Sequence, residues 1–170
     1  MELVFANDIV VAEIDWSEYF DIIDNVDGEM PFDDVWFDID WLDTTQVGSF
    51  DQWIGIWVED SFGNLPIDVD EWGYYWYTVN VFDPNDTTPP TLIANAGDKS
   101  FKVDTDVSTI VWANYIDTAQ DVSGYDITHL ITPDISALDT TQVGTVTVPI
   151  TLTDYAGNET TIDVEFGITE

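Results

Sequence analysis

The amino-acid sequence predicts an all-β protein made of two tandem β-sandwich domains, and three observations support that prediction. A stretch of seven residues occurs twice, which indicates a duplicated unit. Short segments alternate apolar and polar residues with the period of two that half-buried strands require. Pro, Gly and Asp separate these segments at short intervals, as is typical of all-β sandwiches. With 45% apolar and 14% aromatic residues, the chain has enough apolar side chains for packed cores.

The duplicated stretch is Leu-Asp-Thr-Thr-Gln-Val-Gly, at residues 42–48 and again at residues 138–144. At the same offset of 96 positions, aromatic residues match in pairs: Phe5 with Phe101, Trp16 with Trp112, and Tyr19 with Tyr115. A later motif matches at an offset of 94, where residues 60–64 correspond to residues 154–158. The first copy therefore carries extra residues, and a further insertion is expected at residues 66–73.

A proline-rich linker separates the two copies. Prolines in residues 83–90 fix φ and remove backbone donors, so we expect a short, stiff connection with the domain boundary near residue 86. The first domain then spans residues 1–86 and the second spans residues 87–170. Charge divides unevenly between them, because residues 1–86 hold 22 acids and no base, whereas residues 87–170 hold 13 acids and two lysines.

Local patterns predict the elements. Residues 145–153 and 162–168 alternate as strands, and the turn residues 154–158 between them predict an antiparallel hairpin. Trp16, Tyr19, Phe20 and Ile23 have the spacing of one helical face, so about two turns of helix are expected there. His129 lies in the alternating segment 125–131 and is expected on the surface of a sheet.

The motifs of both copies resemble the bacterial Ig-like repeat of cell-surface proteins. In the first copy the resemblance rests on Asp-Asn-Val-Asp-Gly at residues 24–28, on the duplicated stretch and on residues 60–64. The second copy fits more fully, opening at residues 86–90 and closing at residues 143–158. The resemblance implies two tandem immunoglobulin-like sandwiches that serve as non-catalytic spacer, adhesive or structural modules on bacterial surfaces and phage virions.

The first copy departs from this pattern at its start. Only residues 1–4 precede Phe5, so the first strand is expected to be short or missing, whereas residues 88–94 supply it in the second copy. A missing edge strand exposes backbone groups that another chain can complete, which makes this edge a candidate for oligomerisation. The alternative is a boundary of the chain as given or a variant of the family.

Composition excludes some partners. The net charge of −33, with Lys99 and Lys102 as the only bases, argues against nucleic acid and against anionic membrane surfaces. No apolar stretch is long enough to insert into a membrane, and residues 1–5 lack the features of a signal peptide. We therefore expect an exterior location, either as a piece of an exported cell-envelope protein or as a virion decoration or fibre protein. Salt adaptation, or repulsion that prevents aggregation, is a second explanation of the charge.

Calcium is the metal that the acidic loops would suit, because hard cations take many oxygen ligands. In the topology that the resemblance implies, loops gather at the ends of the sandwiches. The candidate ligands are Asp21, Asp24, Asp27 and Asp60 in the first domain, and Asp83, Asp86, Asp117, Asp121 and Asp154 around the entry to the second. The alternative is that these carboxylates cap turns and lie on solvated surface.

The first domain contains seven of the eight tryptophans. Alignment of the copies matches Ile54, Ile56 and Val58 with inward-facing residues, which places Trp53 and Trp57 on the outer face where the second domain has Thr147 and Thr151. Tyr74 and Trp76 are expected on the same outer face. Such a patch would be covered by residues 66–73, buried against another subunit, or used to stack sugars such as host glycans; packing is favoured over sugar binding.

The sequence gives little support for catalysis. His129 is the only histidine, no cysteine is present, and no nucleophile elbow, phosphate loop or zinc motif occurs. With 35 acids in the chain, any chosen pair of carboxylates is uninformative. The prediction is a non-enzymatic protein that binds other protein subunits, with a carbohydrate-binding module as the alternative.

Overall fold

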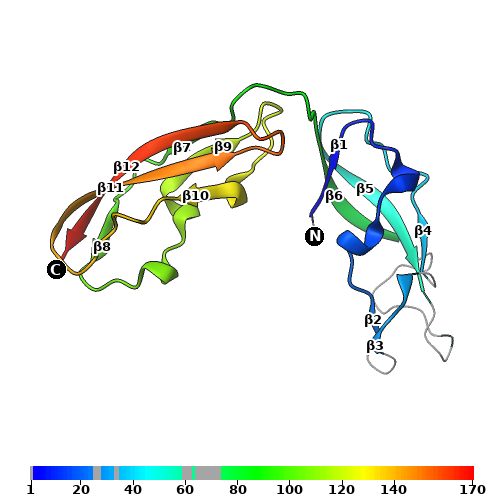
Figure 1. Ribbon diagram of the computed structural model, residues 1–170, viewed down its shortest axis with the longest axis horizontal. Coiled ribbons are helices and arrows are strands. Elements are labelled where there is room, and N and C mark those ends of the chain that lie inside the picture. The colour runs from blue at the N-terminus through cyan, green and yellow to red at the C-terminus, as the bar shows by residue number, and fades with distance from the viewer. Residues whose placement is uncertain (1, 25–27, 33–34, 59–62, 64–73) are drawn as a thin grey trace. The chain divides into compact units, whose positions relative to one another are not determined.

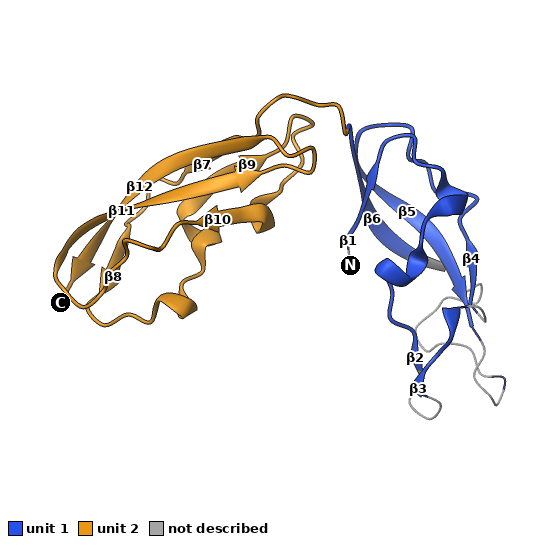
Figure 2. Ribbon diagram, in the orientation of Figure 1, with its two compact units in different colours: residues 1–83 blue, residues 84–170 orange. Residues whose placement is uncertain are grey.

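The computed structural model describes residues 2–24, 28–32, 35–58, 63 and 74–170. Strands make up 44% of the chain, and the helical segments among the described residues are short 3-10 turns, so the all-β prediction is confirmed. The chain forms two compact units, unit 1 with residues 1–83 and unit 2 with residues 84–170 (Figure 2). Within the described residues, no helix is long and apolar enough to cross a membrane.

Unit 1 is organised around one four-stranded sheet (Figure 1). Its strands lie in the order β1 (Glu2–Ala6), β6 (Tyr74–Phe82), β5 (Gly48–Trp57) and β4 (Trp36–Asp38). β1 runs parallel to β6, and the other neighbours are antiparallel. A separate hairpin joins β2 (Ile23–Asp24) to β3 (Gly28–Glu29). The 3-10 turns η1 (Val11–Glu13) and η2 (Trp16–Glu18) lie between β1 and β2.

One face of this sheet forms the core of unit 1. The sheet contributes the buried side chains Leu3, Phe5, Ile54, Ile56, Val79 and Val81. The segment between β1 and β2 packs against them through Val11, Ile14, Trp16, Tyr19 and Phe20. Because that segment covers one face only, the side chains that alternate to the other face of the sheet lie outside this core.

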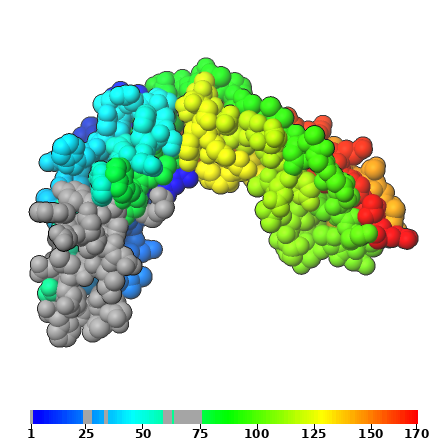
Figure 3. Space-filling view, turned by 180° about the vertical axis from the view of Figure 1, so that it is seen from behind, coloured from blue at the N-terminus to red at the C-terminus, as the bar shows by residue number. Residues whose placement is uncertain are grey.

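Unit 2 contains a four-stranded sheet and a two-stranded sheet. The larger sheet has the order β10 (Ile131–Pro133), β11 (Gly144–Thr153), β12 (Glu159–Thr169) and β8 (Ser100–Lys102). The smaller one pairs β7 (Thr91–Ala94) with β9 (Ile116–Gln120). The 3-10 turns are η4 (Val107–Thr109), η5 (Trp112–Tyr115) and η6 (Thr128–Leu130). In Figure 3 the red end of β12 borders the green segment that contains β8, its parallel neighbour.

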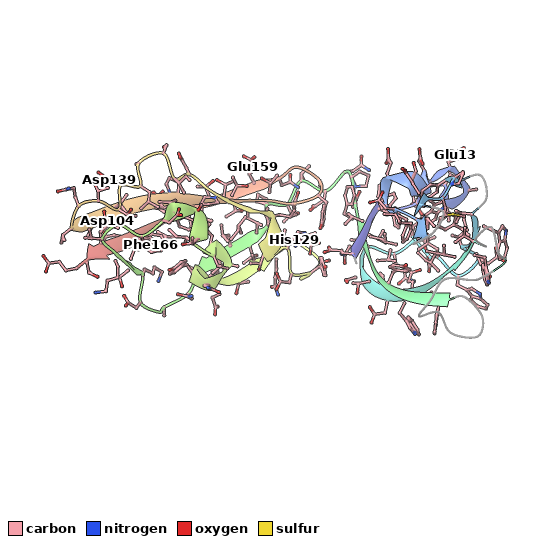
Figure 4. The ribbon with its side chains drawn as sticks, turned by 90° about the horizontal axis from the view of Figure 1, so that it is seen from below. Glu13, Asp104, His129, Asp139, Glu159 and Phe166 are labelled. Atoms are coloured by element: carbon pink, nitrogen blue, oxygen red, sulfur yellow. The ribbon has the colours of Figure 1, made fainter. Side chains whose placement is uncertain are left out.

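The core of unit 2 contains side chains from both sheets. Val148, Ile150 and Phe166 come from the larger sheet and are fully buried, and Phe166 is labelled in Figure 4. Leu92 on β7 and Ala119 on β9 belong to the same buried cluster. β11 and β12 pair along their whole length and form the predicted antiparallel hairpin, so this prediction is confirmed.

The duplicated residues make matched contacts in the two units. The rings of Phe5 and Trp16 lie 6.2 Å apart at 78°, and those of Phe101 and Trp112 lie 6.2 Å apart at 77°. Asp8 and Asp104 both adopt positive φ, 58° and 64°. Each donates its N–H to a carbonyl of the duplicated stretch, that of Thr44 or of Thr140, at 2.9 Å. Figure 4 shows Asp104 and Asp139 at the same end of unit 2. The duplicated stretch thus holds a loop in place in both units.

Two local predictions are wrong. Residues 16–23 contain a single 3-10 turn, which the Asp15 carboxylate caps at its start by accepting the Ser17 N–H at 3.0 Å. The helix does not extend to residue 23, because Ile23 is exposed and pairs with Glu29 in β2 in place of joining the aromatic side chains of the core. His129 lies in η6 rather than on a sheet, and its Nε2 is 3.0 Å from the Tyr155 hydroxyl. The apolar residues around both positions contribute to the cores from irregular backbone, which periodicity does not distinguish from helix or strand.

Candidate functional site

The outer face of the sheet in unit 1 carries four tryptophans. Along β5, Ile54 and Ile56 are buried in the core, and the alternate residues Trp53 and Trp57 lie on the opposite face, as the alternation predicts. The neighbouring strands place Trp36 and Trp76 beside them. We call these four residues the outer aromatic face.

The tryptophans form two cross-strand pairs. Trp53 is directly opposite Trp76, with ring centroids 4.0 Å apart and ring planes at 39°. Trp57 is directly opposite Trp36, with centroids 4.6 Å apart and planes at 40°. One member of each pair is strongly exposed, Trp76 at 58% and Trp36 at 60% of its surface. The outer aromatic face therefore presents two tilted indole pairs to solvent.

Gly55 makes room for one of these pairs. It lies between Trp53 and Trp57 on the same face of β5, where a side chain would contact Trp57. A Cβ at Gly55 would lie 2.4 and 2.6 Å from ring atoms of Trp57, far inside carbon van der Waals contact. The Trp57 indole therefore packs over bare backbone, which brings it against Trp36.

The ladders show which residues of unit 2 stand at the positions of the tryptophans. Gly48 pairs with Val81 in unit 1, as Gly144 pairs with Ile168 in unit 2. Counting along both ladders places Pro149 and Asp163 at the positions of Trp53 and Trp76. Thr153 takes the position of Trp57. The same framework thus forms with Pro, Asp and Thr where unit 1 has three tryptophans.

This register corrects the sequence alignment of the two copies. The alignment matches Trp53 with Thr147 and Trp57 with Thr151, but the ladder keeps the offset of 96 to the end of β5, so the extra residues of the first copy follow Trp57. Gln52 consequently occupies the core position of Val148. Its amide is satisfied locally, because its Oε1 accepts the Asp43 N–H at 2.6 Å and its Nε2 donates to the Asp43 carbonyl at 2.9 Å.

The structure describes the other residues near the outer aromatic face only in part. The backbone of Tyr74 pairs with Gly55, but its side chain and residues 66–73 lie outside the described residues. Sequence reasoning missed Trp36, because β4 has only three residues and gives no alternation to read. Trp41 is also 72% exposed, but it lies outside the strands.

The acidic residues predicted to bind calcium in unit 2 take part in turns. Asp154 is buried, and its carboxylate accepts the Asn158 N–H at 2.8 Å and the Asn158 side-chain amide at 3.1 Å. That amide also donates to the Asp86 carbonyl at 3.1 Å, which ties the start of unit 2 to the hairpin. Asp121 accepts N–H groups from Ser123 and Tyr125.

The remaining metal candidates are scattered. Asp86 accepts the Thr88 N–H, Asp117 is exposed next to Thr118, and Asp21 is exposed in unit 1. Asp83 ends unit 1. The side chain of Asp24 and the residues Asp27 and Asp60 lie outside the described part of the chain. Among described residues, no three acidic or histidine side chains gather closely enough to hold a metal, and calcium binding stays a prediction.

A turn motif, Asp-x-Ser or Asp-x-Thr, recurs along the chain. The first is Asp15, whose carboxylate accepts both the Ser17 hydroxyl at 2.6 Å and the Ser17 N–H at 3.0 Å. Because the hydroxyl, and then the N–H, stabilise the charged form, the pKa of this carboxyl is below its ordinary value of 3.8. The pKa is lowered for the same reason at Asp43, Asp106, Asp126, Asp134 and Asp139.

A small pocket lies at the edge of the core in unit 1. Its volume is about 220 Å³, and its lining includes Asp43, Gln46, Phe50 and Gln52. Ligand pockets of enzymes and receptors usually measure about 300–1,000 Å³. In this pocket the Gln52 amide is already paired with the Asp43 backbone.

No protein-family model matches the chain, and no curated protein matches it.

Proposed function

We propose that the chain is a non-enzymatic structural or adhesion module whose two units are tandem immunoglobulin-like β-sandwiches. One observation carries the proposal, namely four tryptophans on the outer aromatic face of unit 1 where the equivalent ladder positions of unit 2 include Pro149, Thr153 and Asp163. Since the fold forms without them, their exposure supports a contact role. The module binds other protein subunits of a surface assembly through this face.

The charge of unit 1 indicates which kind of partner the outer aromatic face would bind. Unit 1 contains no lysine or arginine, so its carboxylates attract the Lys and Arg side chains of a partner without opposing repulsion from such side chains of its own. Indole faces also attract guanidinium and ammonium groups through cation–π interaction, worth about 0.5–2 kcal/mol each. The favoured partner is therefore a protein surface with Arg or Lys beside apolar side chains, displayed with this chain on a virion or a bacterial cell envelope.

Site-specific photocrosslinking tests the proposal. A photoreactive amino acid replaces Trp76 in one sample and Asp163 in a matched control, because the two residues occupy the same position in the two units. In the native source we expect a covalent adduct with another protein at residue 76 and none at residue 163. Equal adducts at both positions, or none at either, would contradict the proposal. Surface labelling of intact particles and cells with an antibody checks the exterior location.

A carbohydrate-binding module is the second candidate, favoured by the exposure of Trp36 and Trp76 as flat apolar surfaces. The tilt of about 40° within each pair argues for interdigitating side chains over a planar sugar platform. A glycan array separates the two functions. Sugar binding that is lost in both Trp53→Ala and Trp76→Ala, while the variants stay folded, would replace the protein-contact proposal.

A further inference from the structure

The outer face of the unit 1 sheet carries carboxylates beside its indole pairs. Along β5, Asp51 lies two residues before Trp53 and is exposed. From the neighbouring strand β6, the Thr78 hydroxyl donates to the Asp51 carboxylate at 3.1 Å. Because residues two apart in a strand point to the same face, the carboxylate and the Trp53 indole share the outer face, with about 7 Å between their backbone positions. The first indole pair therefore has an acidic neighbour.

The second indole pair has the same kind of neighbour. On β4, Phe37 packs against the core, so Trp36 and Asp38 lie on the outer face of the sheet. Asp38 is directly opposite Gly55, and a Cβ on Gly55 would lie 3.0 Å from the Asp38 Cβ. Asp38 therefore lies beside the part of β5 that separates the two indole pairs.

Carboxylates and indole pairs thus alternate along β5, which lies between β4 and β6 (Figure 1). From the start of β5, the order is Asp51, Trp53 with Trp76, Asp38 beside Gly55, and Trp57 with Trp36, in steps of two residues. One carboxylate and one indole pair repeat after four residues, about 13–14 Å along a strand. In unit 2 the ladder positions of the two carboxylates hold Thr147 and Thr132. The shared ladder therefore does not require this alternation.

We propose that each carboxylate and the indole pair that follows it bind one arginine side chain, so that the outer aromatic face binds an extended partner segment with arginines four residues apart. This inference rests on the proposed function and names the side chains that the partner presents. In an extended segment, residues four apart lie on one face at the same spacing of about 13–14 Å.

The chemistry of the two groups favours arginine over lysine. A guanidinium is planar, so it stacks on an indole face while the N–H groups at its edge donate to a carboxylate. A lysine ammonium is a compact, strongly hydrated charge that does not stack. Asp51 accepts the Thr78 hydroxyl, and Asp38 accepts the Asp40 N–H at 3.2 Å. Since an ionised carboxylate has about four acceptor sites, guanidinium donors can join these bonds.

An NMR titration of the full chain tests the inference through the indole N–H resonances, assigned with single Trp→Phe variants. The probe is the end-blocked peptide Thr-Arg-Thr-Val-Thr-Arg-Thr. Matched peptides carry lysine, or the neutral analogue citrulline, in place of both arginines. The probe should shift the resonances of Trp36, Trp53, Trp57 and Trp76 and bind about fivefold or more tightly than either matched peptide. A peptide with its arginines three residues apart should bind more weakly, because these side chains leave an extended chain on opposite faces.

Single charge removals identify the binding groups. Asp38→Asn and Asp51→Asn keep the shape of the side chain and remove its charge, so each should weaken probe binding about two- to fivefold. Asp163→Asn is the matched control, because it removes one charge at the unit 2 position of Trp76. At about 0.15 M salt, charges more than about 8 Å away are largely screened, so the control should leave the affinity unchanged.

Three results would each overturn the inference: equal affinity for the arginine, lysine and citrulline peptides, no shift of the four indole resonances, or a loss from Asp163→Asn equal to that from Asp38→Asn and Asp51→Asn. The photocrosslinking outcome is separate. A protein adduct at residue 76 together with equal peptide affinities would keep the protein-contact function and remove arginine recognition from it. Absence of the adduct would remove the function itself.

Discussion

Gly55→Ala tests how the outer aromatic face is built. The added Cβ would lie 2.4 Å from one Trp57 ring atom and 3.0 Å from the Asp38 Cβ, so the indole must leave its place. Losing the pair with Trp36 costs about 0.5–1.5 kcal/mol. If the ring gives up about 40 Å² of buried apolar surface, about 1 kcal/mol more is lost. Ala also lowers the conformational entropy of the unfolded chain relative to Gly, which offsets about 0.4–1 kcal/mol of this loss. We expect a net destabilisation of about 1 kcal/mol.

The measurement is urea and thermal unfolding of unit 1, followed by tryptophan fluorescence, with circular dichroism to detect coupled indoles. A loss of about 1 kcal/mol lowers the melting temperature by about 4–8 °C for a domain of this size. The coupled-indole signal of Trp36 and Trp57 should weaken as well.

The control is Gly167→Ala in unit 2, where the nearest atoms to a Cβ are 3.9 Å away. This change should be neutral or slightly stabilising. The double variant Gly55→Ala with Trp57→Thr removes the clash and should cost less than the sum of the two single changes. If Gly55→Ala is as harmless as Gly167→Ala and leaves the coupled-indole signal intact, Trp57 does not pack over Gly55 and the reasoning fails.

Three further predictions follow from the turns and the core. Gln52→Leu removes both hydrogen bonds to the Asp43 backbone and should cost unit 1 about 1–3 kcal/mol in urea unfolding, whereas a loss near zero would mean that water replaces the amide. The lowered pKa of the six Asp-x-Ser/Thr carboxyls stabilises the fold above about pH 4, and this contribution is lost as pH falls through the lowered values, so unfolding midpoints should drop between about pH 4 and pH 2. Asp106→Asn and Asp139→Asn, which keep an acceptor oxygen, should flatten that drop, and an unchanged profile would assign it to other groups. Calcium should raise the melting temperature of unit 2 beyond an ionic-strength control, and chelation should reverse the rise; equal melting temperatures would leave Asp86, Asp121 and Asp154 as turn caps alone.

The fold was readable from the sequence where the pattern repeats or alternates. The duplicated stretch indicated two copies, and the alternation of β11 and β12 gave their hairpin. Alternation in β5 also placed Trp53 and Trp57 opposite Ile54 and Ile56, because side-chain direction in a strand depends only on parity. An alignment shift of two positions changes the matched residues without changing the face, which is why the alignment mismatched the tryptophans and still oriented them.

What the sequence did not give depends on contacts between distant residues. Gln52 shares the inward face of β5 with Ile54 and Ile56, and this polar side chain can be buried there because the Asp43 backbone satisfies its amide. Trp36 belongs to the outer aromatic face only through its pairing with Trp57. The turn at Trp16 resembled a helix because its aromatic side chains share one face, although Ile23 does not extend that face and pairs with Glu29 in β2. The local pattern showed which side chains of a strand share a face. Contacts between distant residues determined the register, length and partners of each element.

The charge of unit 1 favours a basic partner over a second copy of the chain at the outer aromatic face. Two copies meeting through the outer aromatic face would bring together two base-free units within about 8 Å, the Debye length at physiological salt, so repulsion opposes self-association there. A basic partner meets the opposite force, and its Arg or Lys groups suit exposed indoles. Raising the salt concentration should therefore weaken binding at the outer aromatic face, because salt screens the attraction between the carboxylates of unit 1 and a basic partner.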